Sequence, residues 1–117
     1  KMTIHGKGNT YRFYLSVNDF CNGVLFVINK GIYQEIYNIA SDKKYKVINV
    51  VKIISKHMKK NLKKNIKYVN DRPFNDKIYK INCQKIKNLG WKSKNSLEID
   101  IAEICEWYRK NFMLFDK

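Results

Sequence analysis

The chain has 117 residues, which is enough for one modest domain. Apolar residues make up 44% of it and aromatic residues 14%, a composition that excludes intrinsic disorder. The formal net charge of +14 predicts attraction to an anion, whether nucleic acid, an acidic membrane surface or a phosphorylated ligand. No run of about 18 uncharged apolar residues occurs, so no membrane-spanning helix is predicted.

The first half of the chain is predicted to alternate short strands with two helices. Residues 3–5 and 11–17 are predicted strands, separated by a turn at the glycines of residues 6–9. A helix capped by Asn18 or Asp19 then ends at Gly31. Its apolar residues gather on one face: Phe20, Cys21, Val24, Leu25, Val27 and Ile28. A short strand at residues 35–40 precedes a helix at residues 47–61, whose apolar stripe is Val47, Val50, Val51, Ile54 and Met58.

The second half is predicted to be less regular and to end in a long helix. Residues 66–70 form a predicted strand, and residues 71–76 form a loop because Pro73 disfavours helical geometry at Arg72. A short strand at 78–81, a helix at 84–89 that ends at Gly90 and a helix at 96–112 follow. Asn95 and Glu98 resemble a capping box for this last helix. Its predicted buried stripe is Leu97, Ile101, Ile104, Cys105, Tyr108 and Phe112.

The cysteines and histidines predict neither disulfides nor a metal site. Cys21, Cys83 and Cys105 are odd in number and lack paired spacing, so we expect buried free thiols in a reducing compartment. His5 and His57 have no cysteine or histidine at ligand spacing, so no metal is expected.

A run of lysines surrounds the end of the second predicted helix, at positions 56, 59, 60, 63, 64 and 67. It fits either a polyanion-binding patch or, more simply, a solvated helix end with cations near its negative pole. No aromatic residue alternates with these lysines, so nucleic acid is not the favoured partner.

Two other segments could bind a ligand. Arg12 lies in an aromatic strand and faces either water or an anion such as a diphosphate, which its guanidinium fork would suit. In the loop at 71–76, Arg72 could hold phosphate, Phe74 could stack on a base or sugar, and Asn75 could read a carbonyl or hydroxyl. The same loop could instead be stabilised only by local Asp–Arg hydrogen bonds.

No reaction centre is visible in the sequence. The glycines of residues 6–9 match neither the dinucleotide-binding nor the P-loop pattern, and a plain turn is the favoured interpretation. There is also no Ser/His/Asp set and no Tyr-x-x-x-Lys pair in a suitable context.

Taken in order, these segments resemble the nucleotide-sugar 4,6-dehydratases. These enzymes act on UDP-glucose or dTDP-glucose and belong to the extended short-chain dehydrogenase/reductase superfamily. The similar stretches are Ile4-His5-Gly6-Lys7-Gly8, Arg12-Phe13-Tyr14-Leu15 with Asp19, Glu35-Ile36-Tyr37-Asn38-Ile39, Asn70-Asp71-Arg72-Pro73-Phe74-Asn75-Asp76 with Tyr79, Lys85-Ile86-Lys87-Asn88-Leu89-Gly90-Trp91, and Glu106-Trp107-Tyr108 with Asn111. The resemblance covers nearly the whole chain. Ser16, Ala40 and Ile78 depart from the family pattern.

The resemblance implies an α/β fold of short strands with about four helices, the C-terminal substrate-binding lobe of an extended Rossmann-type enzyme. Residues 1–117 would form this one domain, and NAD would be bound by an N-terminal Rossmann domain outside the chain. Arg12 would contact the substrate diphosphate, and the nucleotide pocket would be lined by Asp71, Arg72, Pro73, Phe74 and Asn75. No catalytic residue is assigned, because the family's catalytic groups lie upstream of these segments.

The resemblance further implies a cytoplasmic enzyme that is a homodimer at full length and makes an NDP-4-keto-6-deoxyglucose for rhamnose-type deoxysugars. UDP-glucose is slightly preferred over dTDP-glucose, because Pro73-Phe74-Asn75-Asp76 is similar to the loop of the UDP-glucose enzymes. Two alternatives stay open: an NDP-sugar epimerase of the same superfamily, and a basic binding module without activity.

Overall fold

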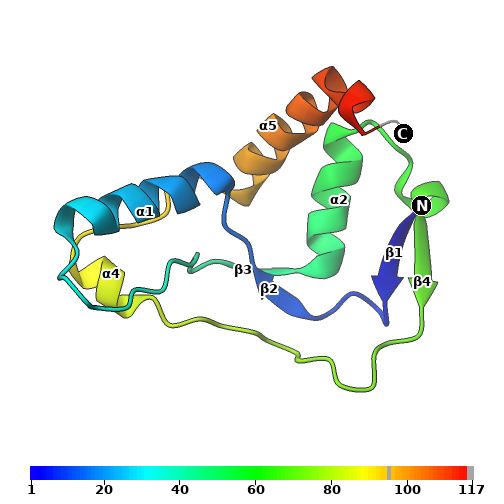
Figure 1. Ribbon diagram of the computed structural model, residues 1–117. Coiled ribbons are helices and arrows are strands. Elements are labelled where there is room, and N and C mark those ends of the chain that lie inside the picture. The colour runs from blue at the N-terminus through cyan, green and yellow to red at the C-terminus, as the bar shows by residue number, and fades with distance from the viewer. Residues whose placement is uncertain (95, 116–117) are drawn as a thin grey trace.

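The computed structural model describes residues 1–94 and 96–115 (Figure 1). The elements in chain order are β1 Met2–His5, β2 Tyr11–Phe13, α1 Val17–Lys30, β3 Lys44–Lys46, α2 Val47–His57, α3 Leu62–Asn65, β4 Ile66–Val69, α4 Gln84–Asn88, α5 Leu97–Lys110 and the 3-10 turn η1 Phe112–Leu114. The predicted mixed α/β fold with short strands is confirmed. The described residues form five α-helices rather than about four, because the single-turn α3 was not predicted.

Two pairs of strands bring distant parts of the chain together. β1 lies parallel to β4, with Met2 opposite Ile66 and His5 opposite Val69. β2 lies antiparallel to β3, with Arg12 opposite Tyr45. Ile4, only 1% exposed, anchors β1 in the interior. β1 and β4 therefore point the same way, and both end at the lower right of Figure 1.

The predicted glycine turn after β1 is confirmed, and it also caps α2. Lys46, at the N-cap of α2, gives no side-chain cap. The free N–H groups of Val47 and Ile48 donate instead to the carbonyls of Thr10 and Gly8, both at 3.0 Å. Gly8 has φ +67°, and a Cβ there would come within 3.0 Å of Ile4 Cγ2.

α2 ends earlier than predicted, at His57 rather than near residue 61. Lys59 adopts the left-handed conformation, with φ 52°, and Lys60 N donates to Ser55 O at 2.9 Å. This is the hydrogen bond of a Schellman ending, in which glycine is the usual residue and therefore the usual sequence signal. Asn61 then caps α3 by accepting from Lys64 N at 3.2 Å.

The N-cap predicted for α1 was wrong by two or three residues and that predicted for α5 by one. Ser16 caps α1, because its Oγ accepts from Asp19 N at 3.2 Å. Asp19 is buried instead, and its two carboxylate oxygens each accept from Lys94 N at 3.1 Å. Ser96 caps α5, whereas the predicted cap Asn95 lies outside the described residues.

Three predicted strands are shorter or absent. β2 ends at Phe13, because its partner β3 has only three residues. Residues 35–40 are not a strand, since none of the described strands pairs with them. Their side chains are fixed individually: Asn38 Nδ2 donates to Asn82 O at 3.0 Å, and Glu35 pairs with Lys85. Of residues 78–81, only Ile78 forms a bridge, with Tyr11.

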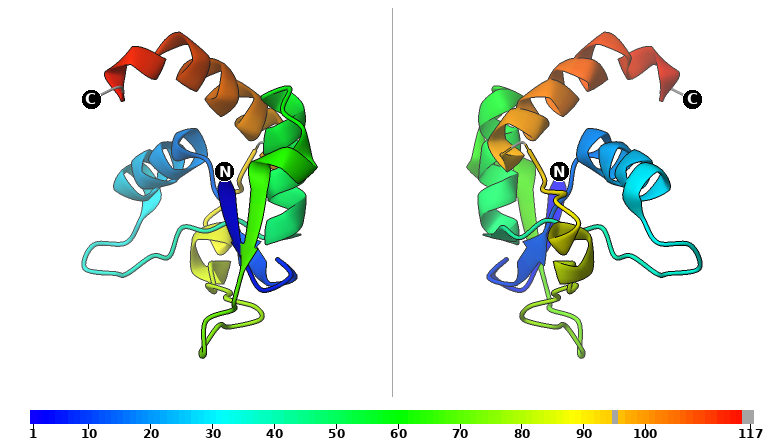
Figure 2. Two further views of the ribbon diagram at one scale, coloured as in Figure 1. Left: turned by 90° about the vertical axis from the view of Figure 1, so that its right-hand side faces the viewer. Right: turned by 90° about the vertical axis from the view of Figure 1, so that its left-hand side faces the viewer.

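Most of the buried apolar residues gather in two small clusters. One gathers Ala40, Cys83, Ile86 and Trp91 between α1 and α4, and the other gathers Val50, Leu97, Ile101 and Cys105 between α2 and α5. Leu15 packs on the first and Tyr14 on the second, so the link between β2 and α1 joins them. Figure 2 shows α1 on one side of the molecule and α2 on the other, with α5 beginning beside α2 and running across the top towards the α1 side.

Many of the apolar side chains that were predicted to lie on buried helix faces are exposed. In α1 only Asp19 and Gly23 are buried, and Phe20, Leu25 and Ile28 are 48%, 56% and 72% exposed. In α5 the predicted stripe is buried at Leu97, Ile101 and Cys105, but Ile104, Tyr108 and Phe112 are not. The prediction of buried thiols is confirmed for Cys83 and Cys105 and wrong for the exposed Cys21. No helix in the described part of the chain is long and apolar enough to cross a membrane.

Ile86 offers a direct test of the first cluster. It is 0% exposed, so Ile86→Ala should leave a cavity and lower the free energy of unfolding by about 2–5 kcal/mol. Ile36, which is 83% exposed, is the matched control, and Ile36→Ala should change stability by less than about 0.5 kcal/mol. Urea unfolding of the two variants would measure both values, and equal losses would contradict this description of the core.

Candidate functional site

The carboxyl ends of β1 and β4 bring a glycine turn beside an acidic loop residue. Gly6 N donates to Val69 O at 2.9 Å, which continues the strand pairing by one residue. Gly6 has φ +57°, and a Cβ there would lie 2.8 Å from Asp71 Oδ2. Glycine at position 6 therefore permits both the turn and the close approach of Asp71.

Asp71 organises the loop that follows β4. Its Oδ1 accepts from its neighbour's backbone, Arg72 N at 2.9 Å, and from Asn75 Nδ2 at 2.7 Å. An amide that donates through Nδ2 to one partner presents its Oδ1 to another. Asp71 thereby fixes how Asn75 faces the rest of the protein.

Arg12 is the partner that Asn75 meets. Arg12 Nη2 donates to Asn75 Oδ1 at 2.9 Å, while Nη1 donates to Asp76 O at 2.9 Å and to Tyr11 O at 2.7 Å. Tyr11 N also donates to Lys77 O at 2.8 Å, so β2 holds the segment from Asn75 to Lys77 at both of its ends. Arg12 Nε–H has no hydrogen-bond partner among the residues of 1–94 and 96–115.

A hollow of about 500 Å³ lies beside this network, lined by Gly6, Lys7, Asn9, Thr10, Tyr11, Asp71, Lys77 and Ile78. Two of its lining residues are lysines. The ammonium groups of Lys44 and Lys46 also lie over the Tyr11 ring, 5.1 and 5.6 Å from its centre. Basic side chains therefore outnumber the single carboxylate, and the hollow suits an anion.

The structure brings together three of the six predicted site residues, Arg12, Asp71 and Asn75. Arg72, Pro73 and Phe74 lie exposed on the same loop, and Phe74 is 98% exposed. The sequence reasoning missed Lys7, Thr10 and Lys77 as lining residues. The signal for Lys7 was available, because a basic residue between two glycines directly after a strand is well placed to meet a phosphate.

The arrangement offers basic groups and held hydrogen-bond donors beside a hollow, and among the described residues it shows no group that would carry out a reaction. In the described residues, no three His, Cys, Asp or Glu side chains gather where they could hold a metal ion. Gly6 and Gly8 connect β1 to β2, whereas a dinucleotide site needs a glycine turn between a strand and a helix. These residues therefore do not fit NAD.

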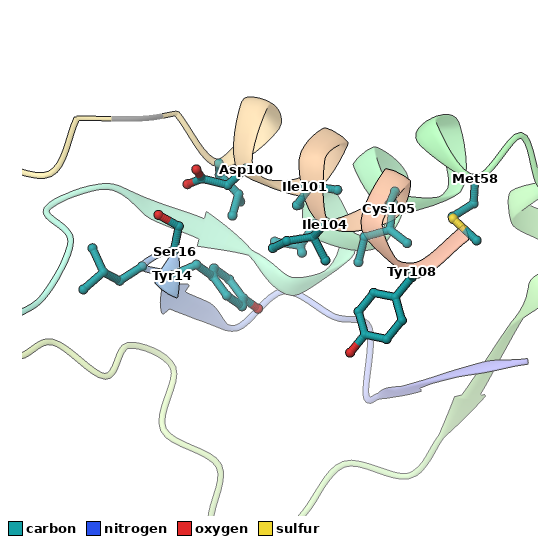
Figure 3. A pocket seen from close by; sticks show the side chains of 12 residues that line it. Tyr14, Ser16, Met58, Asp100, Ile101, Ile104, Cys105 and Tyr108 are labelled. Carbon is teal, nitrogen blue, oxygen red and sulfur yellow. The ribbon is translucent and has the colours of Figure 1, made fainter. Parts of the chain in front are cut away.

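A second hollow of about 410 Å³ is an apolar groove between α2 and α5, shown in Figure 3. Burial raises the pKa of the Tyr14 hydroxyl, an effect that nearby Arg12 partly offsets. Burial likewise raises the pKa of the Cys105 thiol, against a smaller opposing effect of Arg109. Both groups stay neutral near pH 7, so the groove is unlike the basic hollow in its chemistry.

Comparison with known proteins gives a consistent result. The family model described as GDP-mannose 4,6 dehydratase matches residues 1–104. The chain is 36% identical over 110 residues to a trifunctional UDP-glucose 4,6-dehydratase/UDP-4-keto-6-deoxy-D-glucose 3,5-epimerase/UDP-4-keto-L-rhamnose-reductase of Arabidopsis thaliana. That match covers 94% of this chain and 16% of the plant protein.

Two solved structures share the fold. The dTDP-glucose 4,6-dehydratase of Bacillus anthracis in complex with NAD has a TM-score of 0.81 and 36% identity, over 95% of this chain and 35% of that one. The UDP-glucose 4-epimerase of Thermotoga maritima with UDP-glucose has a TM-score of 0.84 and 26% identity, over 96% of this chain and 36% of that one. The chain thus spans about a third of each of these two proteins.

The two arginines near the hollow should behave differently in solution. Arg12→Ala removes the hydrogen bonds to Asn75 and Asp76, so backbone amides at residues 71–77 should exchange with deuterium several-fold faster. Arg72→Ala is the matched control, because the Arg72 side chain makes no hydrogen bond to the described residues. Mass spectrometry of the exchanged peptides would show the difference, and equal exchange in the two variants would contradict the anchoring role of Arg12.

Proposed function

The chain belongs to the GDP-mannose 4,6-dehydratase family within the extended short-chain dehydrogenase/reductase superfamily, and we propose that it is the substrate-binding part of an NAD-dependent NDP-glucose 4,6-dehydratase. The observation that carries the proposal is the network of Arg12, Asn75 and Asp71 beside the hollow that contains Lys7 and Lys77. This network would hold the Arg12 guanidinium in place as a cationic donor for a diphosphate.

The proposed ligand contacts follow from the charges at the site. Arg12 Nε–H and the ammonium groups of Lys7 and Lys77 would hold the diphosphate oxygens through charge-assisted hydrogen bonds. Arg72 and Phe74, exposed on the loop that follows Asp71, would close over the nucleotide, with Arg72 adding a charge-assisted contact to a phosphate and Phe74 stacking on the base. Asp71 would act on the ligand indirectly, by orienting Asn75 and through it Arg12.

We propose that NAD, when bound by another part of the enzyme, supplies the hydride chemistry at the sugar. The 117-residue chain would position the substrate: it would hold the nucleotide diphosphate so that the sugar extends towards that cofactor. No catalytic residue is assigned within residues 1–117.

The substrate would be UDP-glucose rather than dTDP-glucose, and the product a 4-keto-6-deoxy sugar nucleotide for rhamnose-type synthesis. The stretch Pro73-Phe74-Asn75-Asp76 supports this choice. We also expect the assembled enzyme to be a cytoplasmic homodimer, as the family resemblance implies.

Two surfaces support the proposal that this lobe packs against a larger domain of the same enzyme. The exposed apolar face of α1 continues into Ile32, Tyr33 and Ile36, which are 64%, 88% and 83% exposed. Residues 35–40 have no strand partner among the described residues. A Rossmann-type sheet would cover the first surface and pair with the second.

An epimerase of the same superfamily is the second candidate, because the Thermotoga maritima epimerase has the same fold at a TM-score of 0.84. The product separates the two activities, since an epimerase keeps the hydroxyl at C6 and a dehydratase loses it. A binding module without activity is the third candidate, and it predicts nucleotide binding without turnover in any assembly.

Binding of UDP tests the site directly. Arg72→Ala should weaken UDP binding by about 1.5–3 kcal/mol, which is the usual contribution of a charge-assisted contact. Lys64→Ala is the control, because it removes the same charge from exposed α3, outside the hollow. Isothermal titration with UDP and with uridine would measure the effect; tight binding of uridine, or equal losses in both variants, would refute a diphosphate site.

The chain alone should not catalyse the reaction. Incubation with NAD and UDP-glucose should give no 4-keto-6-deoxyglucose nucleotide by mass spectrometry, because the described residues lack both a dinucleotide site and a reaction centre. Formation of that product by the 117-residue chain would contradict the proposal that this chain binds the substrate while another part of the enzyme binds NAD and carries out the reaction.

A further inference from the structure

The positive charge of the protein is concentrated in one part of the chain. Residues 43–70 contain ten lysines and no acidic residue, so about a quarter of the chain carries ten of the fourteen net charges. The other 89 residues are closer to balance, with 14 basic and 10 acidic side chains. The excess of lysine is therefore a local feature of the protein as well as a general one.

The fold gathers five of these lysines at one tip of the molecule. They occupy the turn after α2, the single-turn helix α3 and β4, and we call them the basic tip: Lys59, Lys60, Lys63, Lys64 and Lys67. All five are exposed, and none forms an ion pair with a described residue, whereas Lys56 pairs with Glu98 at 3.5 Å. Figure 1 shows α3 at the right-hand edge, away from α1 and α4.

The backbone of the basic tip is held by hydrogen bonds, so its charges stay close together. Lys60 N donates to Ser55 O at 2.9 Å, and Asn61 caps α3 by accepting from Lys64 N at 3.2 Å. β4 is in turn paired with β1. Five like charges within nine residues repel one another, and residues 43–70 contain no carboxylate to offset the repulsion. An anionic partner would relieve it.

The composition of the basic tip suits a flat anionic surface better than a nucleic acid. Residues 47–67 contain no Phe, Trp or Tyr on which a base could stack, and residues 43–70 contain no arginine to make a forked contact with a base or phosphate. Lysines act as point charges, which is sufficient for attraction to a layer of anionic headgroups. Leu62 and Ile66 are half-buried, so this attraction would be electrostatic rather than an apolar insertion.

We propose that the basic tip binds the surface of an anionic lipid bilayer. The protein lies on the membrane without crossing it, and the five lysine ammonium groups face the headgroups. β4 leads from the basic tip to the Asp71 loop, and its four residues span roughly 13 Å. The basic tip and the candidate ligand site thus lie at opposite ends of this strand, so membrane binding leaves the hollow open.

Co-sedimentation with lipid vesicles would test the proposal on the 117-residue chain. The chain should bind vesicles of phosphatidylcholine with about 30% phosphatidylserine, and it should bind pure phosphatidylcholine at least tenfold more weakly. Raising the salt from about 0.1 to about 0.5 M should release it, because counterions then screen the charges over a shorter distance. Equal binding to both kinds of vesicle would point to the exposed apolar faces and overturn the proposal.

Two pairs of exposed lysines provide matched variants. Lys63→Gln with Lys64→Gln removes two charges from the basic tip, and Lys92→Gln with Lys94→Gln removes two from the link between α4 and α5. The first double variant should bind the anionic vesicles at least tenfold more weakly, and the second should change binding less than threefold. Circular dichroism should show that both remain folded. Equal losses would mean that only the total charge matters, and would overturn the assignment to the basic tip.

Competition with single-stranded poly(U) separates a membrane from a nucleic acid. Poly(U) added at a phosphate concentration equal to that of the phosphatidylserine should displace less than half of the vesicle-bound chain. Displacement of most of the chain would identify nucleic acid as the preferred partner and overturn the proposal.

These outcomes are independent of the UDP measurement. Neither Lys63 nor Lys64 lines the hollow, so the double variant of the basic tip should bind UDP as the unsubstituted chain does. Vesicle binding without UDP binding would keep the basic tip and reject the proposed function, and UDP binding without vesicle binding would do the reverse.

Discussion

The parallel pairing of β1 with β4 places the candidate ligand groups next to one another. The two strands are separated by about half the chain, and each is followed by an irregular segment at the same edge. Because parallel strands end together, the Gly6 turn and the Asp71 loop meet there. The positive φ of Gly6 and its lack of a Cβ let Asp71 approach. Asn75, Arg12 and the basic hollow then follow from where Asp71 lies.

Two short pairs of strands and a few helices leave the lobe incompletely packed. Its two apolar clusters are each built on four buried residues and are joined mainly through the link between β2 and α1. Outside them, one face of α1 and one side of α5 expose large apolar side chains. Such surface is unusual for a protein that works alone, because each exposed patch loses the stabilisation that burial would provide.

Local features of the fold could be predicted from the sequence, and long-range ones could not. The glycine turn, α4 and the stripe of α2 follow from residues close together in the chain. The end of α2 was missed because Lys59, rather than glycine, takes the left-handed conformation. Residues 35–40 have the composition of a strand, but a strand also needs a neighbour to pair with. At the site, the resemblance identified Arg12 and the loop, whereas the contacts of Lys7 and Lys77 depend on the pairing of β1 with β4.

In the proposed function, Arg12 would have two roles that depend on each other. Its Nη groups hold Asn75 and the Asp76 carbonyl, and its Nε–H would donate to the ligand. A guanidinium fixed before binding loses less side-chain entropy when a phosphate arrives, so the contacts with the loop would strengthen those with the ligand. Lysine could not replace it, because a single ammonium group lacks the planar fork that serves both sides at once. The chain of contacts from Gly6 through Asp71 and Asn75 thus explains why residues without any reactive role would still control how tightly the nucleotide binds.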